Sequence, residues 1–134
     1  VEQIVASGFI GSIGLNERPT PAELRRVQRE LRAWGLQALA TRQARDLTYG
    51  QLRLALVARA FVRARRLYLL DEPFDGLDAE ARARLRDRLL KVWKRGAAVV
   101  MATHHEEDRL EQAGNTLLLR RGRAPLVQSG NTAS

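Results

Sequence analysis

The sequence predicts an α/β fold built around a parallel β–α–β unit. Two short apolar runs, 67–70 and 98–101, are typical of strands that are buried on both faces of a parallel sheet. The segment between them has helical apolar spacing, begins at Asp78, which can cap a helix, and ends before Gly96. A strand, a helix and a strand at this spacing favour a right-handed crossover. The predicted inner stripe of the helix is Ala81, Leu85, Leu89, Val92 and Trp93.

The composition fits one globular domain. A chain of 134 residues, 45% of them hydrophobic, can bury a core without disulfides or a structural metal. There is no cysteine, which excludes a disulfide framework, a thiolate zinc site and a thiol nucleophile. The longest uncharged run, 3–16, is shorter than the ~20 apolar residues of a membrane span. Because residue 1 is a valine rather than an initiator methionine, we expect a fragment of a longer protein.

The first half of the chain predicts three helices. Residues 2–15 fit a glycine-weakened helix followed by a loop. A capping box at 20–23, with proline at the first helical position, begins a helix that Gly35 ends. A second capping box at 48–51 begins a largely buried helix that extends to about residue 64.

Shorter elements are expected after the second strand. A short helix is predicted near 106–112. The apolar segments 117–119 and 126–127 flank Arg121 and Gly122, which favours an edge hairpin. Residues 129–134 are expected to form a frayed tail.

The positive charge is concentrated in the first half. Residues 1–66 hold 12 arginines and 5 acidic residues, a charge of +7, whereas residues 67–134 hold 11 basic and 10 acidic residues, a charge of +1. Such a distribution fits solvated helix faces, and it also fits contact with phosphates of a nucleic acid.

Acidic side chains follow the first predicted strand, and histidines follow the second. Asp71 and Glu72 come directly after residues 67–70, and residues 103–105 come after the second strand. Ligands of open α/β sheets bind beyond the carboxyl ends of parallel strands, so these groups should converge at one edge. Asp71 is suited to Mg²⁺ held through water, and Glu72 to a general base. Alternatively, the two acids only cap the turn at Pro73.

The second capping box is a candidate anion site. Backbone N–H groups and the Thr48 hydroxyl at the start of this helix can bind phosphate oxygens, and Gly50 permits close approach of the backbone. A plain helix cap without a ligand has the same pattern, so both interpretations stay open.

The two adjacent histidines are poor candidates for a shared metal. Consecutive side chains lie about 100° apart on a helix and on opposite faces of a strand. The acids at 106–108 suit the first turn of a helix. We interpret His104 as a neutral hydrogen-bonding partner of a phosphate or of water.

Four segments together resemble the ATP-binding-cassette (ABC) ATPases in identity, order and spacing. They are Leu47–Gln51, Leu67–Pro73, Asp75–Asp78 and Thr103–His104, which resemble the signature, Walker B, D-loop and switch-histidine motifs. The resemblance implies a partial P-loop NTPase fold, with a helical signature subdomain at 1–66 and the Walker B to C-terminal part of the ATPase core at 67–134. It implies ATP and Mg²⁺ as cofactors of the intact protein.

The resemblance also assigns roles to residues. Asp71 would hold Mg²⁺ through water, Glu72 would polarise the attacking water, and His104 would contact the γ-phosphate. The signature residues would complete the nucleotide site of a facing subunit; they are Thr48, Tyr49, Gly50 and Gln51. The D-loop would comprise Asp75, Gly76, Leu77 and Asp78, and Asp78 would couple the two sites of the dimer.

The chain departs from the family pattern in two respects. Tyr49 stands where the family usually has glycine, and Thr48 stands where it usually has serine. No Gly-x-x-x-x-Gly-Lys-Ser/Thr phosphate loop is present in the sequence. We therefore expect the C-terminal part of a nucleotide-binding domain that does not hydrolyse ATP in isolation. Residues 7–15 and the doubled histidine weakly resemble molybdenum-type transport ATPases.

The resemblance implies a second ATPase subunit and a transmembrane permease as partners, at the cytoplasmic face of a membrane. A soluble ABC ATPase acting on nucleic acid or the ribosome is the alternative, which the low aromatic content of 5% disfavours. An inert truncated module is a third possibility. A sheet without further strands would expose an edge and apolar faces, so we expect the chain to dimerise or swap elements.

Overall fold

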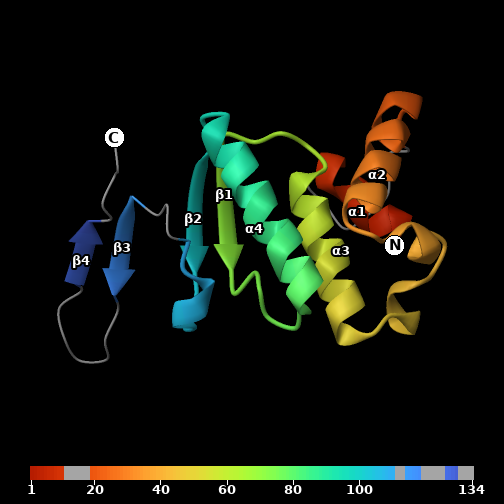
Figure 1. Cartoon of the computed structure of the whole chain (residues 1–134). Helices are drawn as coiled ribbons and strands as arrows, with labels where there is room; N and C mark the ends of the chain where they lie inside the picture. The colour runs from red at the N-terminus through yellow and green to blue at the C-terminus, as the bar shows by residue number, and fades with distance from the viewer. Residues whose placement is uncertain (11–18, 111–113, 119–125, 130–134) are drawn as a thin grey trace. The chain divides into compact units, whose positions relative to one another are not determined.

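The computed structural model describes residues 1–10, 19–110, 114–118 and 126–129, which fall into two compact units, 1–102 and 103–134 (Figure 1). The first unit contains α1 (Glu2–Ile10), α2 (Pro21–Ala33), η1 (Gln37–Leu39), η2 (Ala44–Asp46), α3 (Tyr49–Phe61), β1 (Leu67–Asp71), α4 (Ala79–Lys94) and β2 (Ala98–Ala102). The second contains η3 (Glu106–Asp108), β3 (Asn115–Leu118) and β4 (Leu126–Ser129). The predicted subdomain boundary at residue 66 stays a prediction.

The parallel β–α–β unit is confirmed. β1 and β2 pair in parallel, from Leu67 opposite Ala98 to Asp71 opposite Ala102. Asp78 caps α4 as predicted, because its carboxylate accepts the N–H of Ala81 at 2.8 Å. The chain leaves this helix through Gly96, whose φ of 87° suits glycine.

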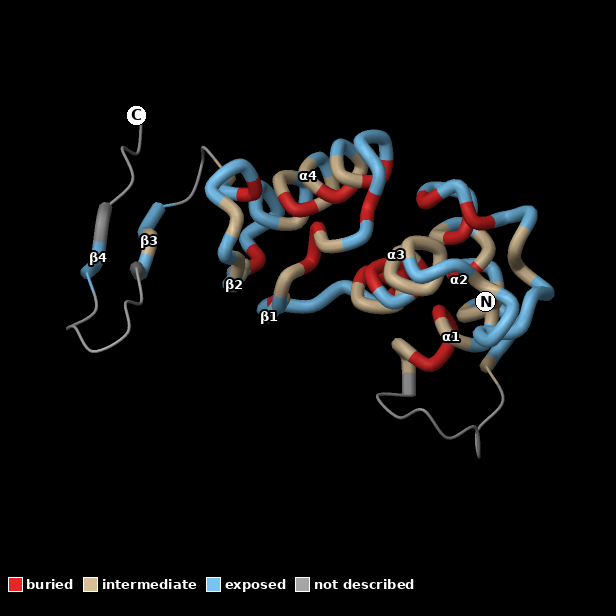
Figure 2. Tube along the Cα trace, turned by 90° about the horizontal axis from the view of Figure 1, so that it is seen from below, coloured by how far each residue is buried: buried red, intermediate tan, exposed pale blue. Residues whose placement is uncertain are grey.

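The prediction that both strands are buried on both faces is wrong for this chain. Leu69 is 70% exposed and Val100 is 56% exposed, whereas Tyr68, on the other face of β1, is buried. Side chains alternate between the faces of a strand, and α4 packs against one face of the two-stranded sheet only. The burial of successive residues alternates along both strands, and Figure 2 colours the whole trace by burial. One face of the β1–β2 sheet is therefore apolar and exposed.

The inner stripe of α4 was predicted too long. Ala81, Leu85 and Leu89 are buried, but Trp93 is 48% exposed. A spacing of four residues overshoots a helical turn by about 40°, so a residue twelve positions after Ala81 lies about 120° away from it. Trp93 therefore lies outside the buried stripe.

The three N-terminal helices are confirmed over the described residues. α1 covers 2–10, and the remainder of its predicted segment, 11–15, lies outside the described residues. Gly8 lets α1 approach α3 closely, since a Cβ there would lie 2.3 Å from the carbonyl oxygen of Arg59. The capping box of α2 forms: Thr20 Oγ1 accepts the N–H of Glu23 at 3.3 Å, and the Glu23 carboxylate accepts the N–H of Thr20 at 2.8 Å.

The third helix ends three residues earlier than the predicted residue 64. α3 stops at Phe61, because the chain must leave the helix before β1 begins at Leu67. Its aromatic end joins the helices to the sheet: the Phe61 ring lies 5.6 Å from Trp34 of α2 and 5.0 Å from Tyr68 of β1, between ring centroids. The three N-terminal helices and β1 therefore share one core.

The second unit confirms the hairpin but corrects its surroundings. β3 and β4 pair antiparallel, from Asn115 opposite Ser129 to Leu118 opposite Leu126. Ser129 therefore belongs to a strand rather than to a tail. The helix predicted near 106–112 is a single 3₁₀ turn at η3, after which Arg109 is extended. Residues 111–112, the hairpin turn around Arg121 and the tail 130–134 lie outside the described residues.

Candidate nucleotide site

The main chain at Glu72 has an unusual conformation. Its φ is 43°, and it is the one non-glycine residue with positive φ in the described part of the chain. Its N–H donates to the carbonyl oxygen of Ala102 in β2 at 3.0 Å, so the end of the sheet fixes one side of this peptide. Left-handed backbone at a residue with a Cβ costs about 1–2 kcal/mol and persists where the surroundings over-determine it. Glu72 is half-buried, and the neighbouring Asp71 is exposed.

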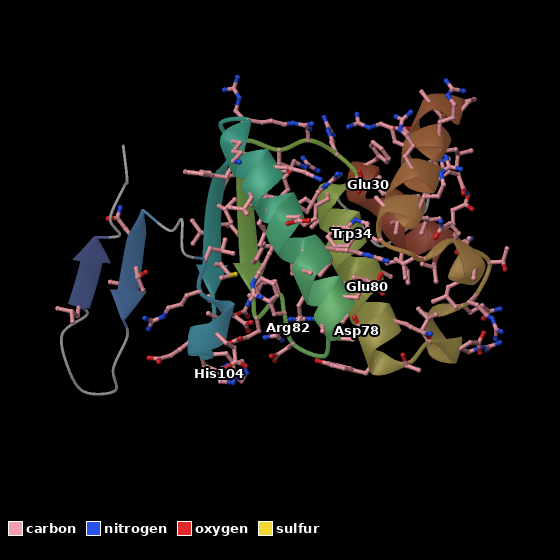
Figure 3. All side chains as sticks on the ribbon, viewed as in Figure 1. Glu30, Trp34, Asp78, Glu80, Arg82 and His104 are labelled. Carbon is pink, nitrogen blue, oxygen red and sulfur yellow. The ribbon has the colours of Figure 1, made fainter. Side chains whose placement is uncertain are left out.

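The turn after Glu72 is anchored by an apolar residue. Phe74 is fully buried, and its carbonyl oxygen accepts the N–H of Leu77 at 3.2 Å and Nη1 of Arg82 at 3.1 Å. The guanidinium groups of Arg82 and Arg86 lie 5.5 and 5.3 Å from the centre of the Phe74 ring, within the range of cation–π attraction. Figure 3 shows Asp78 at the N-cap of α4 and Arg82 in its first turn, beside this turn of the chain. The residues predicted as a D-loop therefore form an ordered turn between β1 and α4.

The predicted signature segment forms the N-terminus of α3. Thr48 Oγ1 accepts the N–H of Gln51 at 3.3 Å, and Oε1 of Gln51 accepts the N–H of Thr48 at 3.1 Å. This reciprocal cap satisfies two of the main-chain donors at the helix start. The N–H groups of the next residues lie at the positive end of α3, where helices bind anions. The geometry fits both the plain cap and the phosphate site.

The signature segment and the D-loop are in direct contact, which sequence reasoning missed. A Cβ on Gly76 would lie 2.4 Å from Cε1 of Tyr49, and one on Gly50 would lie 2.7 Å from the carbonyl oxygen of Gly76. Gly76 also has a φ of 70°. The Tyr49 ring thus covers a glycine that no larger residue could replace without displacement, although 68% of Tyr49 remains exposed. The unusual tyrosine of the signature packs on the D-loop.

Arg53 is a second residue of this site that sequence reasoning missed. Its Nη2 donates to the carbonyl oxygens of Asp71 at 3.0 Å and Glu72 at 2.5 Å. An arginine on a mostly buried helix carries no sequence signal for such a contact, since the acceptors are main-chain atoms 18 and 19 residues away.

The predicted histidine lies in the second unit. His104 is exposed, and its ring centroid lies 3.8 Å from that of His105, whose main-chain N–H donates to Thr103 Oγ1 at 3.1 Å. The structure describes this unit separately from Asp71 and Glu72. The convergence of His104 with the two acids stays a prediction.

The acids at the end of β1 fit a magnesium ion bound mainly by other ligands. Among the residues that the structure describes, no group of three or more His, Cys, Asp or Glu side chains could enclose a metal. Mg²⁺ usually keeps several waters and takes one or two carboxylates together with substrate phosphates. Asp71, an exposed carboxylate at the carboxyl end of a parallel strand, has the chemistry that this mode of binding requires.

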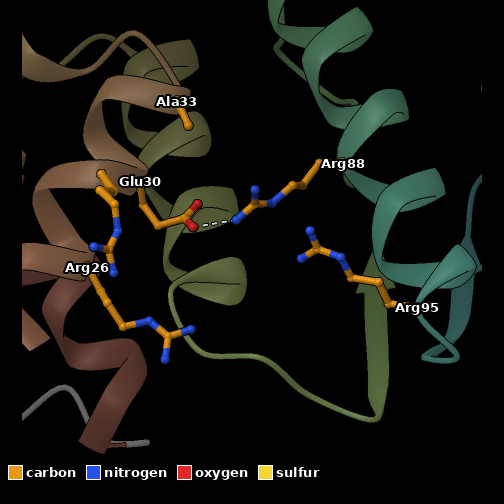
Figure 4. A pocket seen from close by; sticks show the side chains of 6 residues that line it. Arg26, Glu30, Ala33, Arg88 and Arg95 are labelled. Carbon is orange, nitrogen blue, oxygen red and sulfur yellow. Dashed lines mark hydrogen bonds and ion pairs between the residues drawn. The ribbon is translucent and has the colours of Figure 1, made fainter.

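A separate cavity lies between α2 and the C-terminal half of α4. It has a volume of about 410 Å³, and its lining is Arg26, Arg29, Glu30, Ala33, Arg88 and Arg95. Glu30 forms an ion pair with Arg88, which Figure 4 shows as a dashed line. Its carboxylate also accepts the Nε1–H of Trp34 at 3.1 Å. Four arginines and one glutamate make the lining strongly positive. The cavity lies toward the end of α4 opposite to Asp78 and the D-loop.

Comparison with known proteins decides the family. A family model described as "AAA domain, putative AbiEii toxin, Type IV TA system" matches residues 14–107. The ABC transporter ATP-binding protein YlmA of Bacillus subtilis is 34% identical over 122 residues, which are 90% of this chain and 46% of that protein. A solved ATP-binding subunit of an ABC transporter superposes with a TM-score of 0.79 at 25% identity, over 96% of this chain and 52% of that one. The chain belongs to the ABC ATPases, as part of their nucleotide-binding domain.

The comparisons also show how much of the length of its relatives this chain spans. The sulfate/thiosulfate import ATP-binding protein CysA of Xanthomonas campestris is 39% identical over 109 residues, 80% of this chain but 32% of that protein. The ABC chain thus spans about half the length of these relatives or less. The α/β fold of a P-loop NTPase and the family predicted from the motifs are confirmed, and the resemblance to molybdenum-type transport ATPases stays a prediction. In the described part of the chain, none of the helices has the length and apolar character that a membrane span requires.

Proposed function

We propose that this ABC chain is the half of an ATP-hydrolysing transporter subunit that carries the signature and Walker B motifs. The observation that supports this most is the site at the end of β1. There the left-handed peptide of Glu72 follows Asp71, and the next turn packs against the capped start of α3. Phosphoryl transfer depends mainly on positioning and on charge stabilisation around metal-bound phosphates, and this edge supplies groups for both.

The two acids have different roles in the proposal. Asp71 would hold Mg²⁺ through water, and the ion would supply charge neutralisation at the phosphates. Glu72 accepts a proton from the water that attacks the γ-phosphate, as a general base. Its main chain is fixed by the hydrogen bond to Ala102, which holds the carboxylate at the sheet edge. His104 hydrogen-bonds the γ-phosphate in the assembled subunit.

The signature acts on a facing subunit. The start of α3 binds phosphate oxygens of the nucleotide held by the other subunit, through the N–H groups and hydroxyl of Thr48–Gln51. The contact of Gly50 and Tyr49 with Gly76 joins this anion site to the D-loop. Asp78, at the end of the D-loop, couples the two nucleotide sites. The unit of function is therefore a pair of ATPase subunits.

A transmembrane permease is the second partner in the proposal. The relatives are ATP-binding proteins of transporters, and such proteins act at the cytoplasmic face of the membrane through a permease. The permease would select the cargo. The basic helical part of this chain offers a surface for that contact.

Substitution of Glu72 tests the proposal in the full-length protein. Glu72→Gln keeps the shape of the side chain but removes the base, so ATP binding should persist while hydrolysis slows by a factor of about 10²–10⁴. Turnover measured at saturating Mg-ATP gives the rate, and equilibrium binding of a labelled nucleotide gives the affinity. Unchanged turnover would refute the role of Glu72.

Calorimetry on the 134-residue chain is the matched control. The chain has no phosphate loop in its sequence, so Mg-ATP should not bind it tightly. A submicromolar dissociation constant would show that this half alone forms a nucleotide site, contrary to the proposal.

A nucleic acid is the second candidate partner, and the arginine-lined cavity is the observation that favours it. The cavity and the +7 charge of residues 1–66 fit the phosphates of a polynucleotide. A salt-dependent gel shift separates the two functions. No shift of DNA or RNA at low salt removes this candidate, whereas a shift that Arg29→Gln and Arg95→Gln together abolish supports it. A full-length protein that neither hydrolyses ATP nor binds a nucleic acid would support the third possibility, an inert module.

A further inference from the structure

We infer that Arg53 is a positioning residue for Glu72: it links the signature helix to the end of β1 and maintains the left-handed peptide that carries the proposed general base. The inference deepens the proposed function and rests on it for the role of Glu72. Arg53 touches neither nucleotide nor water in this scheme, and it acts through the main chain of the neighbouring acids.

The first support is the geometry of the contact. One nitrogen of Arg53, Nη2, donates to two consecutive carbonyl oxygens, those of Asp71 and Glu72. Hydrogen bonds from a charged donor are stronger than neutral ones, and both carbonyl oxygens lie within hydrogen-bonding distance of Nη2. Because the acceptors are main-chain oxygens, the contact fixes the peptides and does not use the carboxylates of the two acids.

The second support is the strain at Glu72. A φ of 43° at this residue requires contacts that hold both sides of its peptide. The N–H of Glu72 is held by the carbonyl oxygen of Ala102 at 3.0 Å, and its own carbonyl oxygen accepts both Arg53 and the N–H of Asp75, the latter at 3.2 Å. Of these three hydrogen bonds, the one from Arg53 comes from α3, whereas the other two come from β2 and from the turn itself.

The third support is the environment of the arginine. Nε of Arg53 is buried and has no hydrogen-bond partner among the described residues. Burying a polar nitrogen of a cation without a partner is unfavourable. The unfavourable burial of Nε is consistent with a need for Nη2 of the same side chain, which donates to the carbonyl oxygens of Asp71 and Glu72.

The location gives the contact its consequence. Arg53 lies two residues after Gln51, the last residue of the segment proposed to bind phosphate in trans. The Arg53 side chain therefore links the start of α3 to the Glu72 peptide directly, in addition to the contact of Tyr49 and Gly50 with Gly76. Binding of a nucleotide phosphate at Thr48–Gln51 would therefore affect the orientation of Glu72 in the same subunit.

Amide exchange in the 134-residue chain tests the contact itself. In Arg53→Gln, the amides of Glu72 and Asp75 should exchange about tenfold faster, because a charge-assisted hydrogen bond is lost, while the amide of Leu70, which faces β2 in the same ladder as Glu72, keeps its rate. Arg53→Lys should restore part of the protection. Arg45→Gln, which removes the same charge from a well-exposed side chain before α3, is the control and should change nothing. Unchanged exchange at Glu72 and Asp75 in Arg53→Gln would overturn the inference.

Kinetics in the full-length protein test the positioning role. Arg53→Gln should lower kcat about tenfold at an unchanged KM for Mg-ATP, and Arg53→Lys should recover part of the loss. Adding Arg53→Gln to Glu72→Gln should lower turnover no further, because the arginine acts only through the glutamate. An additive loss in the double variant would overturn the inference. If Glu72→Gln alone leaves turnover unchanged while Arg53→Gln still accelerates exchange, the proposed function fails and Arg53 remains a structural contact of the turn.

Discussion

The edge of the β1–β2 sheet and its uncovered face are built differently. At the edge, Glu72, Gly76 and the start of α3 are held by hydrogen bonds and by contacts that leave no room for a Cβ. On the uncovered face, Leu69 and Val100 project from the same two strands with large exposed fractions. Contacts within residues 1–102 therefore hold the sheet edge in place, whereas no described element of the same unit covers the exposed sheet face.

The largest expected effect comes from the apolar anchor of the edge. Phe74→Ala should lower the free energy of unfolding by about 3–5 kcal/mol, because it empties a fully buried site and removes the ring that Arg82 and Arg86 contact. Urea unfolding followed by circular dichroism measures the change. Phe74→Leu, which keeps most of the volume, should lose much less. Equal losses in the two variants would contradict the role of packing at this turn.

The contact between signature and D-loop should give the next largest effect. Gly76→Ala should cost about 1–2 kcal/mol for the left-handed backbone, and more for the displaced Tyr49 ring. In a Tyr49→Gly background the same substitution should cost only the backbone part, since the ring is gone. The difference between the two costs, measured by urea unfolding, is the strength of the contact. If Gly76→Ala lowers the free energy of unfolding equally in the two backgrounds, the Tyr49 ring can move aside without loss of stability, contrary to the prediction.

The exposed face should respond in the opposite way. Leu69→Thr should change the free energy of unfolding by no more than about 0.5 kcal/mol, because the side chain is already mostly in solvent. It should reduce the self-association that the exposed apolar face predicts, measured as the average mass in light scattering at high concentration. Tyr68→Thr, on the buried face of β1, is the contrasting variant and should destabilise the fold strongly. A parent chain that stays monomeric would refute the predicted association.

The difference between edge and face also separates what the sequence could predict from what it could not. Capping boxes, the β–α–β order and the positions of Asp71 and Glu72 depend on local patterns, and all are found where they were expected. The burial of Leu69 depends on what covers the sheet, and an apolar strand has the same pattern whether or not its second face is packed. Arg53 contacts main-chain oxygens of a segment far away in the sequence, and Tyr49 packs where Gly76 has no Cβ. Neither contact depends on a pattern of side chains that the sequence displays.

The two capping boxes provide the smallest and most selective test. Glu23 closes the box of α2, and the hydrogen bonds that its carboxylate accepts from Thr20, first from the main chain, lower the pKa of Glu23 below its ordinary 4.5. Because the folded pKa is the lower one, this stabilisation is present above pH 4.5 and is lost as the pH falls through the folded pKa.

Gln51 takes the same position in the box of α3 and does not titrate, so the helix of the chemical edge keeps its cap in acid. The melting temperature of Glu23→Gln should therefore fall slightly less between neutral pH and pH 3 than that of the parent chain. The melting temperature of Gln51→Glu should fall slightly more, because its cap at α3 can titrate. Melting curves of the three proteins across this pH range make the comparison. An unaltered pH dependence in Glu23→Gln would contradict the role assigned to this carboxylate.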